Sequence, residues 1–270
     1  MSTLTAPAPA RATMVAPPAA RLSFGRVLRS EWIKLATLRS TWWSLGIAVA
    51  LSVGISLLMA AASADFGAGF PAVSAIVMPM QFTMLVAGIL GAIAVTGEYS
   101  TGMIRSTLAA EPRRGVVLAA KALVVAAVLA VTTIVGYAVA IVLTAPILTQ
   151  QIDWSDAAMS TIPLAYGVLS MMVFALIGLS FGFLIRNGAG AIAATVGVLF
   201  VAPIVVSIFS AFGESWQWIV DLGRYLPMNA AAAVTAPGGG DDVLPALIAL
   251  VAWVVVGLGA GWTVLRTRDA

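Results

Sequence analysis

Six long apolar stretches dominate the pattern of hydrophobic and polar positions along this chain. A helix needs about 20 apolar residues to cross roughly 30 Å of hydrocarbon. The stretches that reach this length cover residues 42–62, 73–96, 116–148, 162–185, 189–212 and 243–265. They predict an all-α integral membrane protein with six transmembrane helices. Pro79 and Pro203 fall inside the second and fifth stretches, where we expect kinks.

An amphipathic helix is predicted just before the first stretch, over residues 22–40. At about 100° per residue, Val27, Trp32 and Leu35 share one face with other apolar residues, whereas Glu31 and Arg39 break the pattern. A basic amphipathic helix at this place is expected to lie in the headgroup plane of the membrane. The alternative is a solvated segment that only orients the chain. Residues 1–21, rich in Ala and Pro, are predicted to be disordered.

The composition places the chain in lipid. Hydrophobic residues make up 61% of the 270 and charged residues only 9%, with a mean hydropathy of +1.05. Soluble domains carry about 25% charged residues, so this chain has too little charge to cover a globule in water. The absence of Cys and His removes disulfides, thiol nucleophiles, imidazole bases and the usual zinc ligands.

The basic residues indicate the topology. With the N-terminus inside, 13 of the 14 Lys and Arg residues fall in cytoplasmic segments, and only Arg224 falls outside. The positive-inside rule therefore predicts that both termini are cytoplasmic, in a multi-pass protein of the cell membrane. A net charge of only +3, scattered along the chain, gives no reason to expect a nucleic acid partner.

The predicted spans carry little chemistry. Glu98 and Lys121 are expected at or just beyond helix ends, where they can reach water. With no Ser–His pair and no pair of carboxylates at membrane depth, the sequence offers neither a protease site nor an obvious coupling-ion site. Small-residue patterns at 178–182 and 257–261 allow close helix packing, either within the chain or in a dimer.

The loop over residues 97–114 is the most informative segment. It predicts a short helix over 101–109, with Ser100 or Thr101 near its N-cap and Pro112 after its end. Ile104 and Leu108 would form one small apolar face, with Arg105 pointing elsewhere. Such a helix suits docking into a groove on another protein. The alternative is an ordinary reverse turn that carries arginines.

This loop resembles the signature of ABC-2 type permeases, the membrane subunits of ATP-binding-cassette exporters. The elements that match in order are Glu98, Thr101-Gly102, Ile104-Arg105-Ser106-Thr107-Leu108, Pro112-Arg113 and Lys121. Thr101 and Gly102 stand in the reverse of the usual Gly-Thr order. The segments at 30–35 and 38–42 are similar to the N-terminal part of actinobacterial members, and those at 184–187 and 226–227 also fit.

The resemblance implies a mechanism. The N-terminal helix, with Glu31, Trp32, Lys34 and Arg39, would be an interfacial connecting helix, and residues 41–268 would form the six-helix ABC-2 type domain. The residues implied in coupling to an ATPase are Glu98, Thr101, Gly102, Ile104, Arg105, Leu108, Pro112, Arg113 and Lys121. Two permease chains and two ABC ATPase subunits would form the working unit, with ATP and Mg on the partner.

The chain itself has no Gly-x-x-x-x-Gly-Lys-Ser/Thr loop. We therefore expect a permease subunit that is not an enzyme and that binds no cofactor or metal of its own. The apolar spans and short outer loops favour export of lipophilic or amphipathic compounds. The alternatives are a six-helix channel or ion-coupled carrier, and a membrane scaffold or sensor of the same fold that transports nothing.

Overall fold

The computed structural model describes residues 23–64 and 70–267, and this part of the chain is helical and contains no strand. The disorder predicted for residues 1–21 lies outside the described residues. The longer helices are α1 (Phe24–Thr37), α2 (Arg39–Ala61), α4 (Met80–Ser100), α6 (Arg114–Thr144), α7 (Thr161–Ile185) and α12 (Val243–Thr267). The shorter α-helices are α3 (Ser74–Val77), α5 (Met103–Ala110), α8 (Gly188–Val196), α9 (Ala202–Phe209), α10 (Gln217–Gly223) and α11 (Pro227–Val234). The remaining helical elements are a π-helical turn, η2 (Gly197–Val201), and three 3₁₀ turns, η1 (Ala62–Ala64), η3 (Ser210–Phe212) and η4 (Glu214–Trp216).

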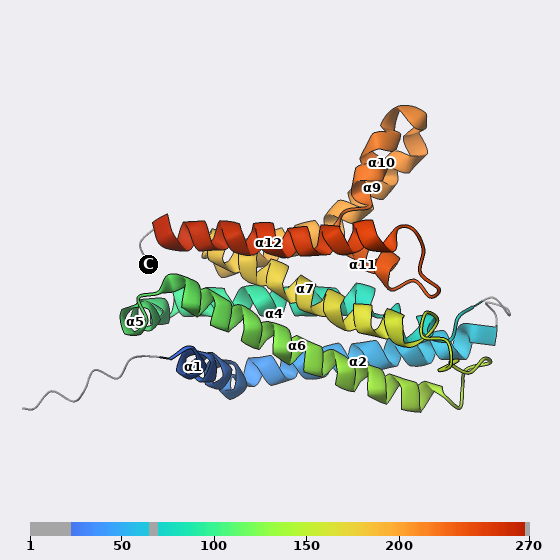
Figure 1. Ribbon diagram of the computed structural model, residues 1–270, viewed down its shortest axis with the longest axis horizontal. Helices are drawn as coiled ribbons and strands as arrows, with labels where there is room; N and C mark the ends of the chain where they lie inside the picture. Colours follow the sequence, from blue (N-terminus) through green and yellow to red (C-terminus); the bar gives the residue numbers. More distant parts are fainter. Residues whose placement is uncertain (1–22, 65–69, 268–270) are drawn as a thin grey trace, which may run out of the picture.

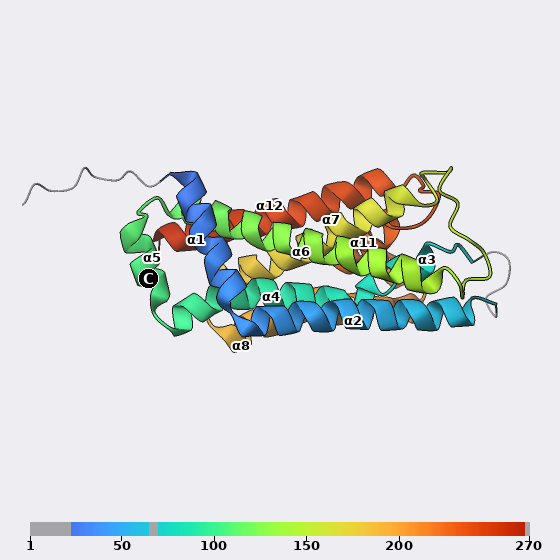
Figure 2. The same cartoon turned by 90° about the horizontal axis from the view of Figure 1, so that it is seen from below.

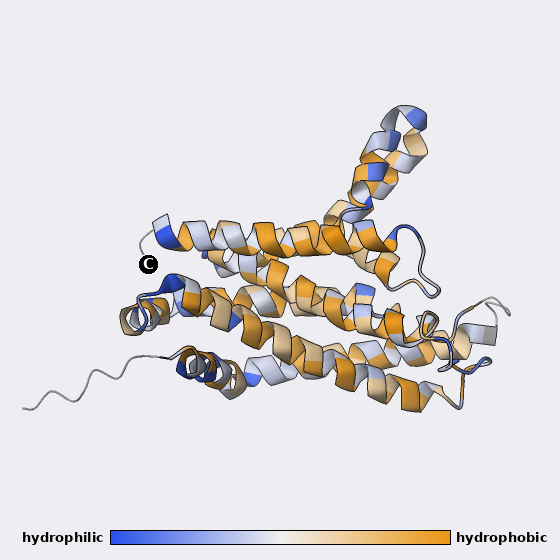
Figure 3. Ribbon diagram, in the orientation of Figure 1, coloured by the Kyte–Doolittle hydropathy of each residue, from blue (hydrophilic) through white to orange (hydrophobic). Residues whose placement is uncertain are grey.

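Six helical segments of the described part are long and apolar enough to cross a membrane, as predicted. They are Arg39–Ala61, Ser74–Ser100, Arg114–Thr144, Thr161–Ile185, Gly188–Phe212 and Val243–Thr267. Apolar residues run along the bundle helices, whereas hydrophilic residues gather toward the bundle ends and on α1 (Figure 3). This arrangement is that of a multi-pass membrane protein.

Helix α7 lies at the centre of the bundle and contacts α4, α6, α8, α11 and α12. Glycines allow its closest approach, which is to α4. A Cβ added at Gly178 would lie 1.8 Å from the carbonyl oxygen of Gly88, and one at Gly91 would lie 1.9 Å from that of Ala175. On α12, Gly257 and Gly261 face Ser180 and Phe183 of α7. Both small-residue patterns therefore pack within the chain.

The second and fifth candidate spans are each interrupted near the proline where a kink was expected. Pro79 separates the single turn α3 from α4. η2 ends at Val201, and Pro203 is the second residue of α9. Beyond this point α9 and α10 leave the bundle and project from it as an arm (Figure 1).

Helix α1 runs across the bundle axis instead of along it (Figures 1 and 2). It lies at the same end of the bundle as α5 and the C-terminal end of α12. Of the residues grouped on the apolar face of α1, Val27 and Leu35 are buried together with Glu31, whereas Trp32 is 50% exposed. Glu31, which interrupts the apolar pattern, points inward because it has charged partners there.

Candidate functional site

Four charged residues from three helices meet at the end of the bundle where α1 lies. Glu31 and Lys34 come from α1, Glu98 from α4 and Lys121 from α6. Lys34 Nζ donates hydrogen bonds to Glu31 Oε1 at 2.7 Å and to Glu98 Oε1 at 2.9 Å. Lys121 Nζ donates to Glu98 Oε1 at 2.7 Å and also pairs with Glu31 Oε2. We call these four residues the ion-pair network.

Three members of the ion-pair network are buried, and the Lys34 side chain is 22% exposed. Glu31 and Lys121 are 3% exposed and Glu98 is 4% exposed. Two carboxylates face two ammonium groups, so the formal charges balance. Balance is needed here because an unpaired charge in a low-dielectric interior costs several kcal/mol. The network therefore fixes the relative positions of α1, α4 and α6.

Local structure explains how each helix presents its charge. Glu31 and Lys34 are three residues apart on α1, so they lie on adjacent positions of one helix face. Glu98 stands two residues before the end of α4, and Lys121 stands seven residues after the start of α6. At 1.5 Å per residue, Lys121 lies about 10 Å inside its helix. The expectation that Glu98 and Lys121 reach water is therefore wrong, because both are held by opposite charges inside the protein.

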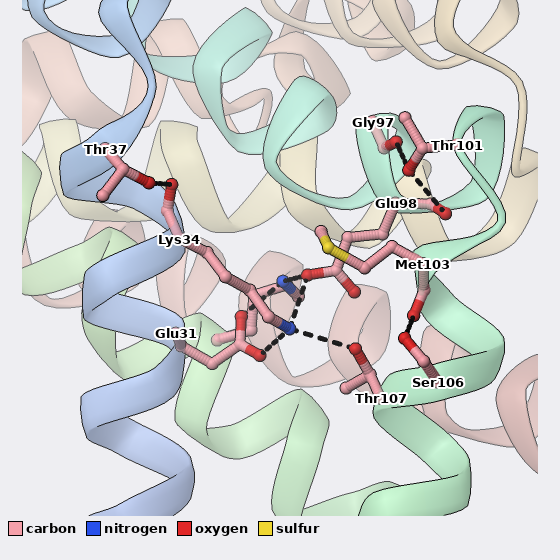
Figure 4. Close-up of polar contacts among 10 residues, drawn as sticks. Glu31, Lys34, Thr37, Gly97, Glu98, Thr101, Met103, Ser106 and Thr107 are labelled. Carbon is pink, nitrogen blue, oxygen red and sulfur yellow. Dashed lines mark hydrogen bonds and ion pairs between the residues drawn. The ribbon is translucent and has the colours of Figure 1, made fainter.

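Helix α5 joins the ion-pair network through a hydroxyl group. Lys34 Nζ donates a third hydrogen bond, 3.1 Å long, to Thr107 Oγ1 on α5. Figure 4 shows Glu31 and Lys34 reaching from α1 toward Glu98 and Thr107. The loop helix is thus connected to α1 directly, and through Lys34 to the end of α4.

The loop forms the predicted short helix with different ends. It begins at Met103 after Gly102, whose φ of 71° is a left-handed conformation suited to glycine. Ser100 and Thr101 do not cap it. Thr101 instead closes the end of α4, where its hydroxyl donates to the carbonyl oxygen of Gly97 at 2.9 Å.

The predicted apolar face of α5 is used inside the chain. Ile104 is buried and Leu108 is half-buried against the bundle core. The prediction that this face is offered to another protein is therefore wrong. The exposed residues of α5 are Met103, Arg105, Ser106, Ala109 and Ala110.

A carboxylate holds the turn that follows α5. Glu111 Oε1 accepts hydrogen bonds from the backbone N–H of Arg113 at 3.1 Å and from its Nε at 2.8 Å. These hydrogen bonds lower the pKa of Glu111 and raise that of Arg113. Pro112, between Glu111 and Arg113, is exposed. Of the other predicted site residues, Arg39 at the start of α2 is also exposed and lies outside this turn.

The pKa of Lys34 is raised above its ordinary value of 10.5. Burial acts strongly in the opposite direction, but hydrogen bonds from Lys34 to Glu31 and Glu98, and the charges of both carboxylates, outweigh it. Lys34 therefore stays protonated at neutral pH.

The structure thus brings together four predicted residues, Glu31, Lys34, Glu98 and Lys121, that the sequence separates by up to 90 positions. Sequence reasoning missed that they contact one another and that Thr107 joins them. One available signal was Glu31, a carboxylate on an otherwise apolar helix face. Among residues 23–64 and 70–267, no group of three or more His, Cys, Asp or Glu side chains is placed to hold a metal ion.

Comparison with known proteins gives no family assignment. No family model matches the chain, and no curated protein matches it either.

Proposed function

We propose that this chain is the membrane subunit of an ABC-2 type ATP-binding-cassette exporter, driven by a separate ATPase. The observation that carries the proposal is the connection of α5 to the rest of the bundle. Thr107 ties α5 to Lys34, and the ion-pair network ties Lys34 to α4 and α6. A force applied to α5 would reach two spans and α1 through these contacts. A coupling helix requires such a connection.

The docking surface in this proposal is the exposed side of α5. Arg105, Ser106 and Ala109 lie on it, whereas Ile104 and Leu108 hold the helix to the bundle. This arrangement changes the choice of test residues, because altering Leu108 would disturb the fold as well as any partner.

The test is to purify the chain with its P-loop ATPase and to measure binding and ATP hydrolysis. We expect the double variant R105E/A109D to fold and insert, but to lose at least tenfold in ATPase affinity, since two charges oppose docking. The matched control is D241R, which reverses an exposed charge in the segment between α11 and α12. Unchanged ATPase binding by R105E/A109D would contradict the assignment of α5.

The proposed topology has both termini in the cytoplasm, α1 in the headgroup plane of the cell membrane, and a second permease chain in the working unit. The exposed apolar side chains of α1, among them Trp32 and Phe24, suit contact with lipid. In this topology α5 faces the cytoplasm, where an ATPase can reach it.

The proposed cargo is a lipophilic or amphipathic compound. A cavity of about 570 Å³ lies between α9, α10, α11 and α12, at the base of the arm. Its lining is mainly apolar and includes Arg224, Asn229 and Asp242. Such a lining suits a molecule with a large apolar part and a small polar one.

A proton-coupled carrier is the second candidate, and one observation favours it. Glu98 Oε2 is buried and has no hydrogen-bond partner among the described residues. Ionisable groups inside spans commonly serve proton transfer. Proteoliposomes that hold the chain alone separate the two candidates. A carrier would move its cargo under a pH gradient without ATP, whereas the ABC permease would not.

A further inference from the structure

A second group of charged residues lies apart from the ion-pair network, between the start of α6 and the end of α12. It lines a cavity of about 570 Å³. Three arginines face this cavity, Arg113, Arg114 and Arg266, together with the indole of Trp262. We call these four residues and the space between them the basic pocket.

Contacts with neighbouring groups hold the cationic side chains in place. Arg114 Nη1 donates hydrogen bonds to the carbonyl oxygens of Leu265 and Arg266, which joins α6 to the C-terminal end of α12. The guanidinium of Arg266 lies 4.7 Å from the centre of a Trp262 ring. Glu111 fixes Arg113. Prepositioned side chains lose less conformational entropy when a ligand binds.

A glycine makes room for the indole. A Cβ added at Gly115 would lie 3.2 Å from Nε1 of Trp262, closer than ordinary contact. Because residue 115 has no side chain, Trp262 can lie against α6 and form one wall of the basic pocket.

The location of the basic pocket indicates its surroundings. Arg114 is the first residue of one candidate span, and Arg266 is the last but one of another. The ends of spans lie in the headgroup layer of a bilayer, where Trp rings are also enriched. Val116, at the edge of the cavity, begins the apolar part of α6.

We propose that the basic pocket binds the headgroup of an anionic phospholipid. Three guanidinium groups line the pocket, and such a lining favours a negatively charged ligand. The planar fork of arginine matches the oxygens of a phosphate group. Basic pockets at the ends of transmembrane helices suit such headgroups, and the adjacent apolar surface of α6 can receive the acyl chains.

The experiment measures lipid binding to the purified full chain by native mass spectrometry, with phosphatidylglycerol and phosphatidylcholine as probes. We expect the chain to retain phosphatidylglycerol in preference. Loss of one charge-assisted contact weakens binding about tenfold. R113Q and R266Q should each show this loss, and the double variant a larger one. R26Q, which removes an exposed charge from α1 at the same end, should bind like the wild type.

Three outcomes would overturn the proposal. Equal retention of the two lipids would show that charge plays no part. Unchanged phosphatidylglycerol affinity in the folded R113Q/R266Q variant would place the lipid elsewhere. Displacement of the lipid by inorganic phosphate at equal concentration would identify a soluble anion as the ligand. Thermal unfolding of each variant, measured without added lipid, verifies that it is folded.

Discussion

Two acidic and two basic side chains hold together parts of the chain that lie far apart in sequence. The ion-pair network places Lys121 between Glu31 and Glu98, and Lys34 between the same two carboxylates. The removal of any one member leaves an uncompensated charge in a buried place. The stability of this end of the bundle should therefore depend on charge balance more than on any single contact.

The first prediction concerns that balance. K121Q leaves two carboxylates facing Lys34 alone, and we expect it to lower the free energy of unfolding by about 3–5 kcal/mol. The double variant E98Q/K121Q restores neutrality, so its loss should be smaller than the sum of the two single losses. Denaturant unfolding of purified protein in detergent measures all three.

The matched control is D221N, which breaks the exposed Arg224–Asp221 pair. It should change the free energy of unfolding by less than about 1 kcal/mol. Strictly additive losses for E98Q and K121Q would contradict the coupling between them.

The second prediction concerns pH. Because the pKa of Lys34 is raised in the folded state, its contribution to stability is complete below 10.5 and is lost as the pH rises through the folded-state pKa. We expect the melting temperatures of wild type and K34Q to differ below pH 10.5 and to converge only as the pH rises well above that value. A constant difference between the two across this range would show that protonation of Lys34 does not stabilise the fold.

At the scale of elements, the length and hydropathy of the apolar stretches predicted the six candidate spans correctly, and Pro79 and Pro203 marked their interruptions. The start of α5 could not be predicted, because it is set by the left-handed conformation of Gly102. The side chains of Ser100 and Thr101 suggested an earlier start, since both residues are common helix caps. The inward face of α1 could not be predicted either. Glu31 is buried only because Lys121, 90 positions away, lies opposite. Such pairings depend on tertiary structure that one sequence does not reveal.

The third prediction concerns the packing of α7 on α4. G178V places side-chain atoms where the backbone of Gly88 lies, so the two helices must separate. We expect loss of the folded protein, or a fall in melting temperature of at least about 4 °C if it folds. G54A is the control, because a Cβ at that exposed helical position meets no other atom within 4 Å. A folded G178V with wild-type melting temperature would contradict the described packing.

At the scale of the whole molecule, the two ends of the bundle differ. One end carries α1, α5, the ion-pair network and the basic pocket. The arm of α9 and α10 projects from the side of the bundle, away from that end (Figure 1). The proposed topology assigns the first end to the cytoplasm.

The fourth prediction tests that topology. The chain has no cysteine, so single cysteines can be added without background. In intact cells, a membrane-impermeant thiol reagent should label S155C, in the segment between α6 and α7, and should leave S106C on α5 unlabelled until the membrane is opened. Both positions are exposed in the structure, so access to the reagent decides the result. The reverse labelling pattern would place α5 outside the cell and contradict the proposed function.

Site-specific photo-crosslinking from α5 tests the central proposal most directly. A photoreactive residue at position 106, on the exposed side of the helix, is activated in native membranes, and the linked protein is identified by mass spectrometry. The account predicts a crosslink to a P-loop ATPase from position 106 and none from position 155. A correctly inserted protein that links to no ATPase from position 106, while it still moves its cargo, would contradict it.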